Sequence, residues 1–169
     1  MAKFVDFPVV YGKLGNHPGF LTTDAALALY RVGMACKPNA QFLDCWPEGG
    51  RSSVLLATVA RNLDGKVKVI CRWDTAPQNA ALYFERAYKT HKLADVAQVF
   101  DYGNDKNGVG AYDLAVVRGD VLPLVNGDLN AAEKIFVYAV RDAVSMDDFE
   151  VKESGQGWVL LEKELANWK

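Results

Sequence analysis

The chain has 169 residues, half of them hydrophobic and 24% charged, and a formal net charge of −2. This length and composition are typical of one globular domain with a single substantial core. The sequence has no lysine- or arginine-rich run and no apolar stretch near the roughly 20 residues that span a bilayer, so we expect neither nucleic acid nor a membrane as a partner. The first residues lack the hydrophobic region of a secretory signal, and we therefore expect a cytoplasmic protein.

The cysteine and histidine content bears on metal binding. Cys36, Cys45 and Cys71 are widely spaced, no pair has CxxC spacing, and the only histidines are His17 and His91. A zinc site needs several such ligands at short spacing, so we expect no metal. We interpret the cysteines as buried free thiols in a reducing compartment.

Turn signals and hydrophobic periodicity divide the chain into alternating helices and strands. Residues 1–22 carry several glycine and proline turn signals and are expected to form an irregular lead-in. Leu55, Leu56 and Val59 have the spacing of one helix face. The expected elements are helices at 24–36, 51–63, from Pro77 onward and at 130–144, strands at 41–45, 66–73, 96–100 and 112–117, and a β-hairpin with strands at 149–154 and 158–163.

This alternation predicts the fold class. Strands separated by helices form a parallel sheet with right-handed crossovers, and a terminal hairpin adds antiparallel strands. We therefore expect a single α/β domain, a Rossmann-like three-layer sandwich with a mostly parallel sheet and a C-terminal antiparallel hairpin. In such sheets ligands bind at the carboxyl ends of the strands.

A turn rich in glycine follows the first expected strand. Asp44 ends the strand, Gly49 and Gly50 form the turn, and Ser52 opens the helix. Such a turn points backbone N–H groups and the positive end of a helix dipole at one spot, which suits a nucleotide-like ligand. Two interpretations stay open: a ligand site, or a tight connection in which Asp44 belongs to a structural hydrogen-bond network.

These motifs resemble those of the class I S-adenosylmethionine-dependent methyltransferases, most of all the compact branch with macrocin O-methyltransferase-like and cephalosporin hydroxylase-like proteins. Phe42-Leu-Asp44 and Gly49-Gly50-Arg-Ser-Ser53 match the family's first motif, and the strand that ends in Gly119-Asp120 resembles its fourth-strand motif. The resemblance covers about residues 22–120 and the closing hairpin. It implies S-adenosylmethionine as the cofactor.

The resemblance also implies roles for individual residues. The glycine turn would lie against the methionine moiety, with Asp44 favouring its ammonium group, and Asp74 would bind both ribose hydroxyls with one carboxylate. The alternative for Asp74 is an N-cap of the following helix. Trp46 and Trp73 would line the pocket, with Trp73 stacking on the adenine, and the alternative for both is packing in the core. Asp101, Asn104 or Asp105 would face the adenine amine. The implied cofactor-binding residues are Asp44, Trp46, Glu48, Gly49, Gly50, Ser52, Trp73, Asp74, Asp101 and Asn104.

The chain departs from the family pattern at three places. Trp46-Pro47 stands where the family has its first glycine, and a tryptophan does not easily adopt positive φ. Arg118 stands where the fourth strand commonly ends in an acid. Between Asp120 and Asn130 we expect only a short loop, so that one helix–strand unit of the family is absent or remodelled.

Two residues are candidates for catalysis. Asp120 is a candidate general base or metal ligand, with a simple Gly-Asp turn as the alternative. His17 is a candidate base from the lead-in, if it reaches over the crevice.

The function that these features favour is methyl transfer from S-adenosylmethionine to an oxygen of a small molecule. The alternative is a non-catalytic module, its pocket blocked by Trp46, that acts in assembly or regulation and forms a homodimer through an exposed apolar hairpin at Trp158-Val-Leu-Leu161. A different nucleotide-binding enzyme on the same scaffold is a third possibility.

Overall fold

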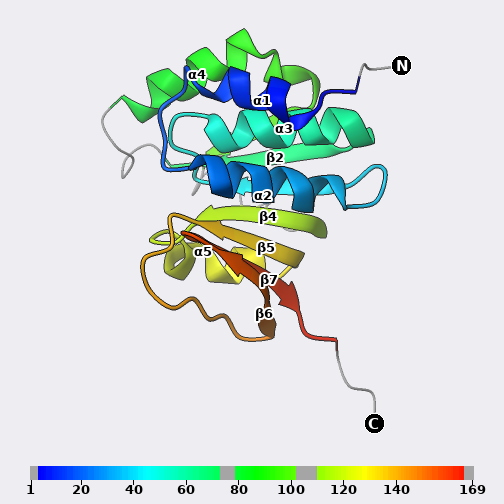
Figure 1. Ribbon diagram of the computed structural model, residues 1–169, viewed down its shortest axis with the longest axis vertical. Coiled ribbons are helices and arrows are strands. Elements are labelled where there is room, and N and C mark those ends of the chain that lie inside the picture. Colours follow the sequence, from blue (N-terminus) through cyan, green and yellow to red (C-terminus); the bar gives the residue numbers. More distant parts are fainter. Residues whose placement is uncertain (1–3, 73–78, 102–109, 166–169) are drawn as a thin grey trace.

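The computed structural model describes residues 4–72, 79–101 and 110–165, apart from the side chains of residues 126 and 128 (Figure 1). The helices are α1 (Phe7–Leu14), α2 (Thr23–Met34), α3 (Arg51–Leu63), α4 (Ala80–Thr90) and α5 (Leu122–Leu129), and the short 3-10 helix η1 spans Leu93–Asp95. The strands are β1 (Gln41–Cys45), β2 (Lys66–Cys71), β3 (Ala97–Asp101), β4 (Tyr112–Arg118), β5 (Ala132–Tyr138), β6 (Phe149–Gly155) and β7 (Trp158–Lys163).

The described strands form one sheet in the order β3-β2-β1-β4-β5-β7-β6. Strands β1 to β5 run parallel, while β7 pairs antiparallel with both β5 and β6. The strand order reverses between β1 and β4, so the topological switch point lies at the carboxyl end of β1. The expected Rossmann-like fold with a closing hairpin is confirmed.

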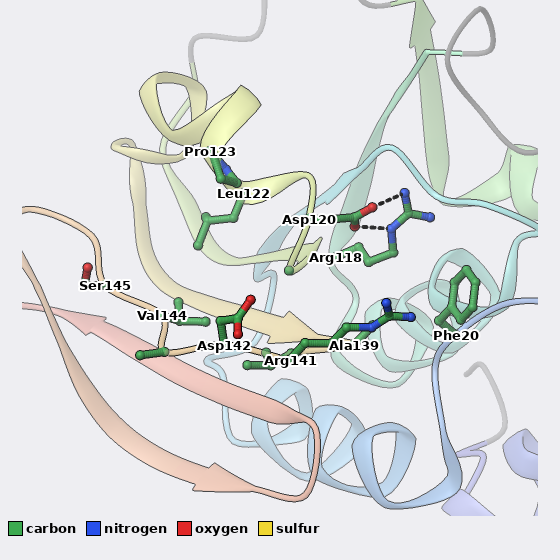
Figure 2. Close-up of a pocket in the computed structure, with 13 residues that line it drawn as sticks. Phe20, Arg118, Asp120, Leu122, Pro123, Ala139, Arg141, Asp142, Val144 and Ser145 are labelled. Atoms are coloured by element: carbon green, nitrogen blue, oxygen red, sulfur yellow. Dashed lines mark hydrogen bonds and ion pairs between the residues drawn. The ribbon is translucent and has the colours of Figure 1, made fainter.

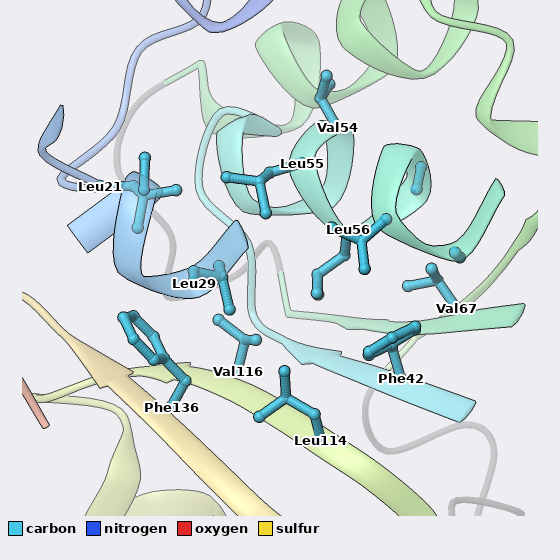
Figure 3. Packing of buried hydrophobic residues seen from close by; sticks show 14 of the residues in the cluster. Leu21, Leu29, Phe42, Val54, Leu55, Leu56, Val67, Leu114, Val116 and Phe136 are labelled. Carbon is cyan, nitrogen blue, oxygen red and sulfur yellow. The ribbon is translucent and has the colours of Figure 1, made fainter. Parts of the chain in front are cut away.

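Alternate residues of each central strand enter two separate apolar clusters, as the two-residue period of a strand requires. Phe42, Leu114 and Val116 face helices α1 to α4 and meet Leu29 and Leu56 (Figure 3). Their sequence neighbours face α5 on the opposite side of the sheet and form the second cluster, which includes Leu43, Ala115, Val117, Val125 and Ile135. The central strands are therefore buried on both faces.

The segment after β4 differs from the prediction. Residues 122–129 form α5, not a loop, and residues 132–138 form β5, not the first part of a helix at 130–144. The reason is burial: Ile135, Phe136 and Val137 are fully buried, and strands covered on both faces have continuous apolar runs instead of alternating ones. The helix–strand unit that we expected to be absent or remodelled is present as α5–β5, and residues 139–148 connect β5 to β6 without a helix.

Two further expectations are corrected at the chain ends. The lead-in contains helix α1, which has a proline in its first turn. The hairpin is not an exposed apolar edge, because β7 lies between β5 and β6 and its residues Trp158, Leu160 and Leu161 are buried. The edge strand on the hairpin side of the sheet is β6, which is polar and mostly exposed.

Cys36, Cys45 and Cys71 carry no disulfide, as expected. In the part of the chain that the structure describes, no helix has the length and apolar character needed to cross a membrane.

Candidate functional site

The turn between β1 and α3 lies at the switch point of the sheet. Gly50 is the N-cap of α3 with φ +96°, and Trp46 also has a positive φ of 53°. The expectation that a tryptophan would resist this conformation is therefore wrong. The Trp46 ring is buried in the second cluster, and the Arg72 guanidinium lies over it at 5.4 Å, so aromatic packing and a cation–π contact hold the strained residue in place.

Asp44 is fully buried at the end of β1 and accepts hydrogen bonds from the first turn of α3. The Ser53 hydroxyl donates to Oδ2 at 2.6 Å, and the Ser52 hydroxyl donates to both oxygens at 2.9 and 3.1 Å. Burial raises the pKa of Asp44 from 3.8 to about 6, although the two hydroxyl hydrogen bonds oppose that rise. Asp44 therefore fastens the start of α3 to β1, and its contact with a ligand stays a prediction.

Glu48 and Arg118 form an ion pair across the mouth of the switch point. The Arg118 guanidinium pairs with the Glu48 carboxylate and also with Asp120, to which Nη2 donates at 2.9 Å. The other Glu48 oxygen accepts from the Phe20 backbone N–H at 3.2 Å. Both members of the pair are largely buried, so the network joins the turn, the end of β4 and the lead-in.

The lead-in residues 15–21 cover the glycine turn, and we call them the cover segment. A Cβ at Gly49 would collide with the Pro18 carbonyl, and one at Gly50 would lie 2.7 Å from the Ala87 side chain of α4. The Arg51 guanidinium fixes the cover segment by donating to the carbonyls of Leu14 and His17 at 3.2 and 3.1 Å. Gly49 and Gly50 therefore allow the cover segment and α4 to pack closely against the turn.

A small cavity of about 10 Å³ lies between the cover segment, Glu48, Ser52 and Tyr138. That volume holds about one water molecule. The cover segment therefore packs directly on Gly49 and leaves little space between itself and the turn.

A larger pocket of about 550 Å³ opens beside this place, at the carboxyl ends of β4 and β5 (Figure 2). Apolar side chains of Leu122 and Pro123 form one wall, and Asp120 and Arg141 contribute charge. Phe20, from the cover segment, also lines it and lies 5.7 Å from the Arg118 guanidinium. The pocket has the size of a small-molecule site.

The structure brings together part of the residue set expected from the sequence. Residues at the β1–α3 turn lie together: Asp44, Trp46, Glu48, Gly49, Gly50 and Ser52. Trp73, Asp74, Asn104 and Asp105 lie outside the described residues. Asp101 is exposed at the end of β3, two strands away from β1.

The two candidate bases lie in different pockets. Asp120 lines the pocket at the ends of β4 and β5, whereas His17 is buried against His91 of the α4 end and does not reach that pocket. Sequence reasoning missed Phe20 and Arg141. Arg141 fell in a segment expected to be helical, and nothing local marks Phe20 as a pocket residue.

No family model and no curated protein matches the sequence, but the fold matches many solved structures. A provisionally assigned caffeoyl-CoA O-methyltransferase from Staphylococcus aureus superposes with a TM-score of 0.65 and 9% identity, over 91% of this chain and 89% of that one. A methyltransferase from Geobacter sulfurreducens gives 0.62 and 17%, over 86% and 82% of the chains. TrmK from M. capricolum, in complex with S-adenosyl-homocysteine, gives 0.54 and 9%, over 86% and 70%. The resemblance to S-adenosylmethionine-dependent methyltransferases is confirmed at the level of the fold.

Proposed function

We propose that the protein is a methyltransferase-like protein that binds S-adenosylmethionine or its demethylated product at the carboxyl edge of β1 and β2. The observation that carries the proposal is the β1–glycine turn–α3 unit at the switch point of a sheet in the order β3-β2-β1-β4-β5-β7-β6. The likeness to TrmK, which was solved with S-adenosyl-homocysteine, supports this choice of ligand. Asp74 and Trp73 are the proposed contacts to the adenosine half.

The proposed methyl acceptor is an oxygen of a small molecule in the pocket beside β4 and β5. Its volume of about 550 Å³ and its apolar wall favour a compact organic substrate. Asp120 is the carboxylate that we propose to accept the proton of the acceptor hydroxyl, with Arg118 orienting it. The three cysteines without disulfides favour the cytoplasm as the location.

Binding requires that the cover segment moves off the glycine turn. The apparent affinity is then reduced by the fraction of molecules in which the turn is open. Arg51→Gln removes the two hydrogen bonds that hold the cover segment, so it is expected to tighten binding of S-adenosylhomocysteine in calorimetric titration. Asp74→Ala is expected to weaken it.

Arg31→Gln is the matched control, because Arg31 is exposed and pairs with Glu153 far from the turn. It is expected to bind like the wild type. If Arg51→Gln binds no more tightly than this control, the cover does not limit access. If neither variant nor the wild type gives heat or a thermal shift, the proposed ligand is wrong.

The second candidate is a non-catalytic module. The Glu48–Arg118 pair and the packing of Pro18 on Gly49 favour it, because both place protein groups against the glycine turn where the proposed cofactor would bind. Such a module would act through assembly, including a homodimer. Sedimentation velocity over a range of concentrations, combined with the absence of ligand heat, would support this alternative.

A further inference from the structure

A second pocket of about 510 Å³ lies between α1, the cover segment and α4, and it shares no lining residue with the pocket at β4 and β5. At its base, Nε2 of His17 and Nε2 of His91 are 2.7 Å apart, and the two rings meet edge to face. His17 is buried and His91 half-buried. One ring must donate a proton to the other, so the pair carries at most one proton on the shared side.

Positive charge surrounds this histidine pair. Lys13 of α1 and Arg86 of α4 line the pocket, and none of the described residues that line it is a carboxylate. Within the described residues, neither cation forms an ion pair. Both therefore have their charge available to a ligand.

The helix ends that border the pocket have their carbonyls satisfied by two further arginines. Arg51 donates to the carbonyls of Leu14 and His17, and Arg61 donates to those of His91 and Lys92 at 3.0 and 2.8 Å. Helix C-termini normally repel anions through their unpaired carbonyls. Here the guanidinium groups offset that repulsion and add two more positive charges behind the histidine pair.

The charges decide between a metal ion and an anion. Two converging Nε2 atoms are a partial metal site, but no group of three or more His, Cys, Asp or Glu side chains that would suit a metal occurs among the described residues. A cation would also be repelled by Lys13 and Arg86, which line the pocket, and by Arg51 and Arg61, whose charges act on the two histidines. An anion would be attracted by the same four groups.

We propose that this pocket binds a small phosphate-bearing molecule. Lys13 and Arg86 supply charge-assisted hydrogen bonds, and Asn16, Tyr83 and Thr90 supply neutral donors at the rim. The volume of the pocket leaves room for a phosphate group and a modest organic part.

Binding of such a ligand is coupled to protonation. Burial lowers the pKa of both histidines, and neighbouring cations lower it further: Arg51 at His17, and His17, Lys13 and Arg61 at His91. A bound anion offsets these cations and favours the protonated pair. The affinity for phosphate should therefore rise as the pH falls.

The test uses the full chain and the fact that it has only two histidines. Their ring resonances are followed by NMR during pH titration, in millimolar sodium pyrophosphate and in sodium chloride of equal ionic strength. Pyrophosphate is expected to raise both titration midpoints and chloride is not. Equal shifts in both salts would reduce the effect to general screening and overturn the proposal.

Variants locate the binding. Lys13→Gln and Arg86→Gln are expected to weaken the pyrophosphate dependence about tenfold each, because each removes one charged contact. Lys152→Gln, the same charge change on the distant strand β6, is expected to have no effect. Unchanged affinity in both pocket variants would overturn the proposal.

Two further additions distinguish other ligands. If zinc chloride moves the histidine signals at stoichiometric concentration and pyrophosphate does not, the pocket is a metal site and the proposal is wrong. If a short oligoribonucleotide moves them and pyrophosphate does not, the phosphate belongs to a nucleic-acid backbone, and the small-molecule proposal is overturned.

Discussion

At the scale of single residues, Asp44 stabilises the β1–α3 turn, because its carboxylate accepts hydrogen bonds from the hydroxyls of Ser52 and Ser53. Asp44→Ala leaves both buried hydroxyls without their acceptor and should lower the free energy of unfolding by about 1–3 kcal/mol. Asp44→Asn keeps one acceptor and should lose less. Urea denaturation measures both. A variant with unchanged stability but lost ligand affinity would instead assign Asp44 to the ligand.

The titration of Asp44 predicts a pH dependence of stability. Its pKa is about 6 in the folded protein and 3.8 when unfolded, so the folded state binds more protons between these values. Its stabilising contribution is present below pH 3.8 and is lost as the pH rises through about 6. Asp44→Asn removes this dependence, so its urea midpoint relative to the wild type should increase from pH 4 to pH 7.

The two histidines change the pH dependence of stability in the opposite direction from Asp44, and both the wild type and Asp44→Asn contain them. The pKa of His17 and of His91 is lowered on folding from 6.5, so the unfolded chain takes up protons first and stability falls as the pH drops below 6.5. The difference between wild type and Asp44→Asn cancels this contribution. A difference that stays constant with pH would contradict the raised pKa of Asp44.

At the scale of elements, the close approach of α3 and α4 depends on Gly50. Gly50→Ala places a methyl group against Ala87 and forces a φ of +96° on alanine, so unfolding should become easier by about 1–3 kcal/mol. The double variant Gly50→Ala/Ala87→Gly removes the collision but keeps the strained φ. It should recover part of the loss in urea denaturation, and no recovery at all would mean that only the backbone strain matters.

Elements with strong local signals could be predicted, and elements defined by tertiary burial could not. The apolar period and glycine turn predict α3, and the alternation of strands predicts the parallel sheet. β5 was missed because Ile135-Phe136-Val137 is buried on both faces, and such a run has no period that distinguishes a strand from a helix. Asn130-Ala-Ala-Glu133 also imitates a capping box.

The site could be predicted only in part for a related reason. A buried acid beside a glycine turn is a local pattern, so the sequence predicts that Asp44 and Gly50 lie together at the end of β1. The packing of Pro18 onto Gly49 joins residues about thirty positions apart, and the pairing of His17 with His91 joins more distant ones. Contacts of this kind leave no trace in local sequence, although they determine whether the turn is open.

At the scale of the whole molecule, we expect the charged edge strand β6 to oppose association of one copy of the chain with another. Its exposed residues Glu150, Lys152 and Glu153 place charges along an edge that otherwise has backbone groups free to pair with another chain. Replacing Glu150 and Lys152 by valine next to the exposed Val151 gives an apolar edge, and we expect this variant to associate through β6. Sedimentation velocity should show a concentration-dependent increase in mass.

The control replaces Glu85 and Lys89, an exposed pair on α4, by valine, because a helix has no unpaired backbone edge to offer. If the control associates to the same extent, added hydrophobic surface alone explains the effect. If the mass of the β6 variant is unchanged, the charges on β6 are not what prevents this edge from pairing with another chain.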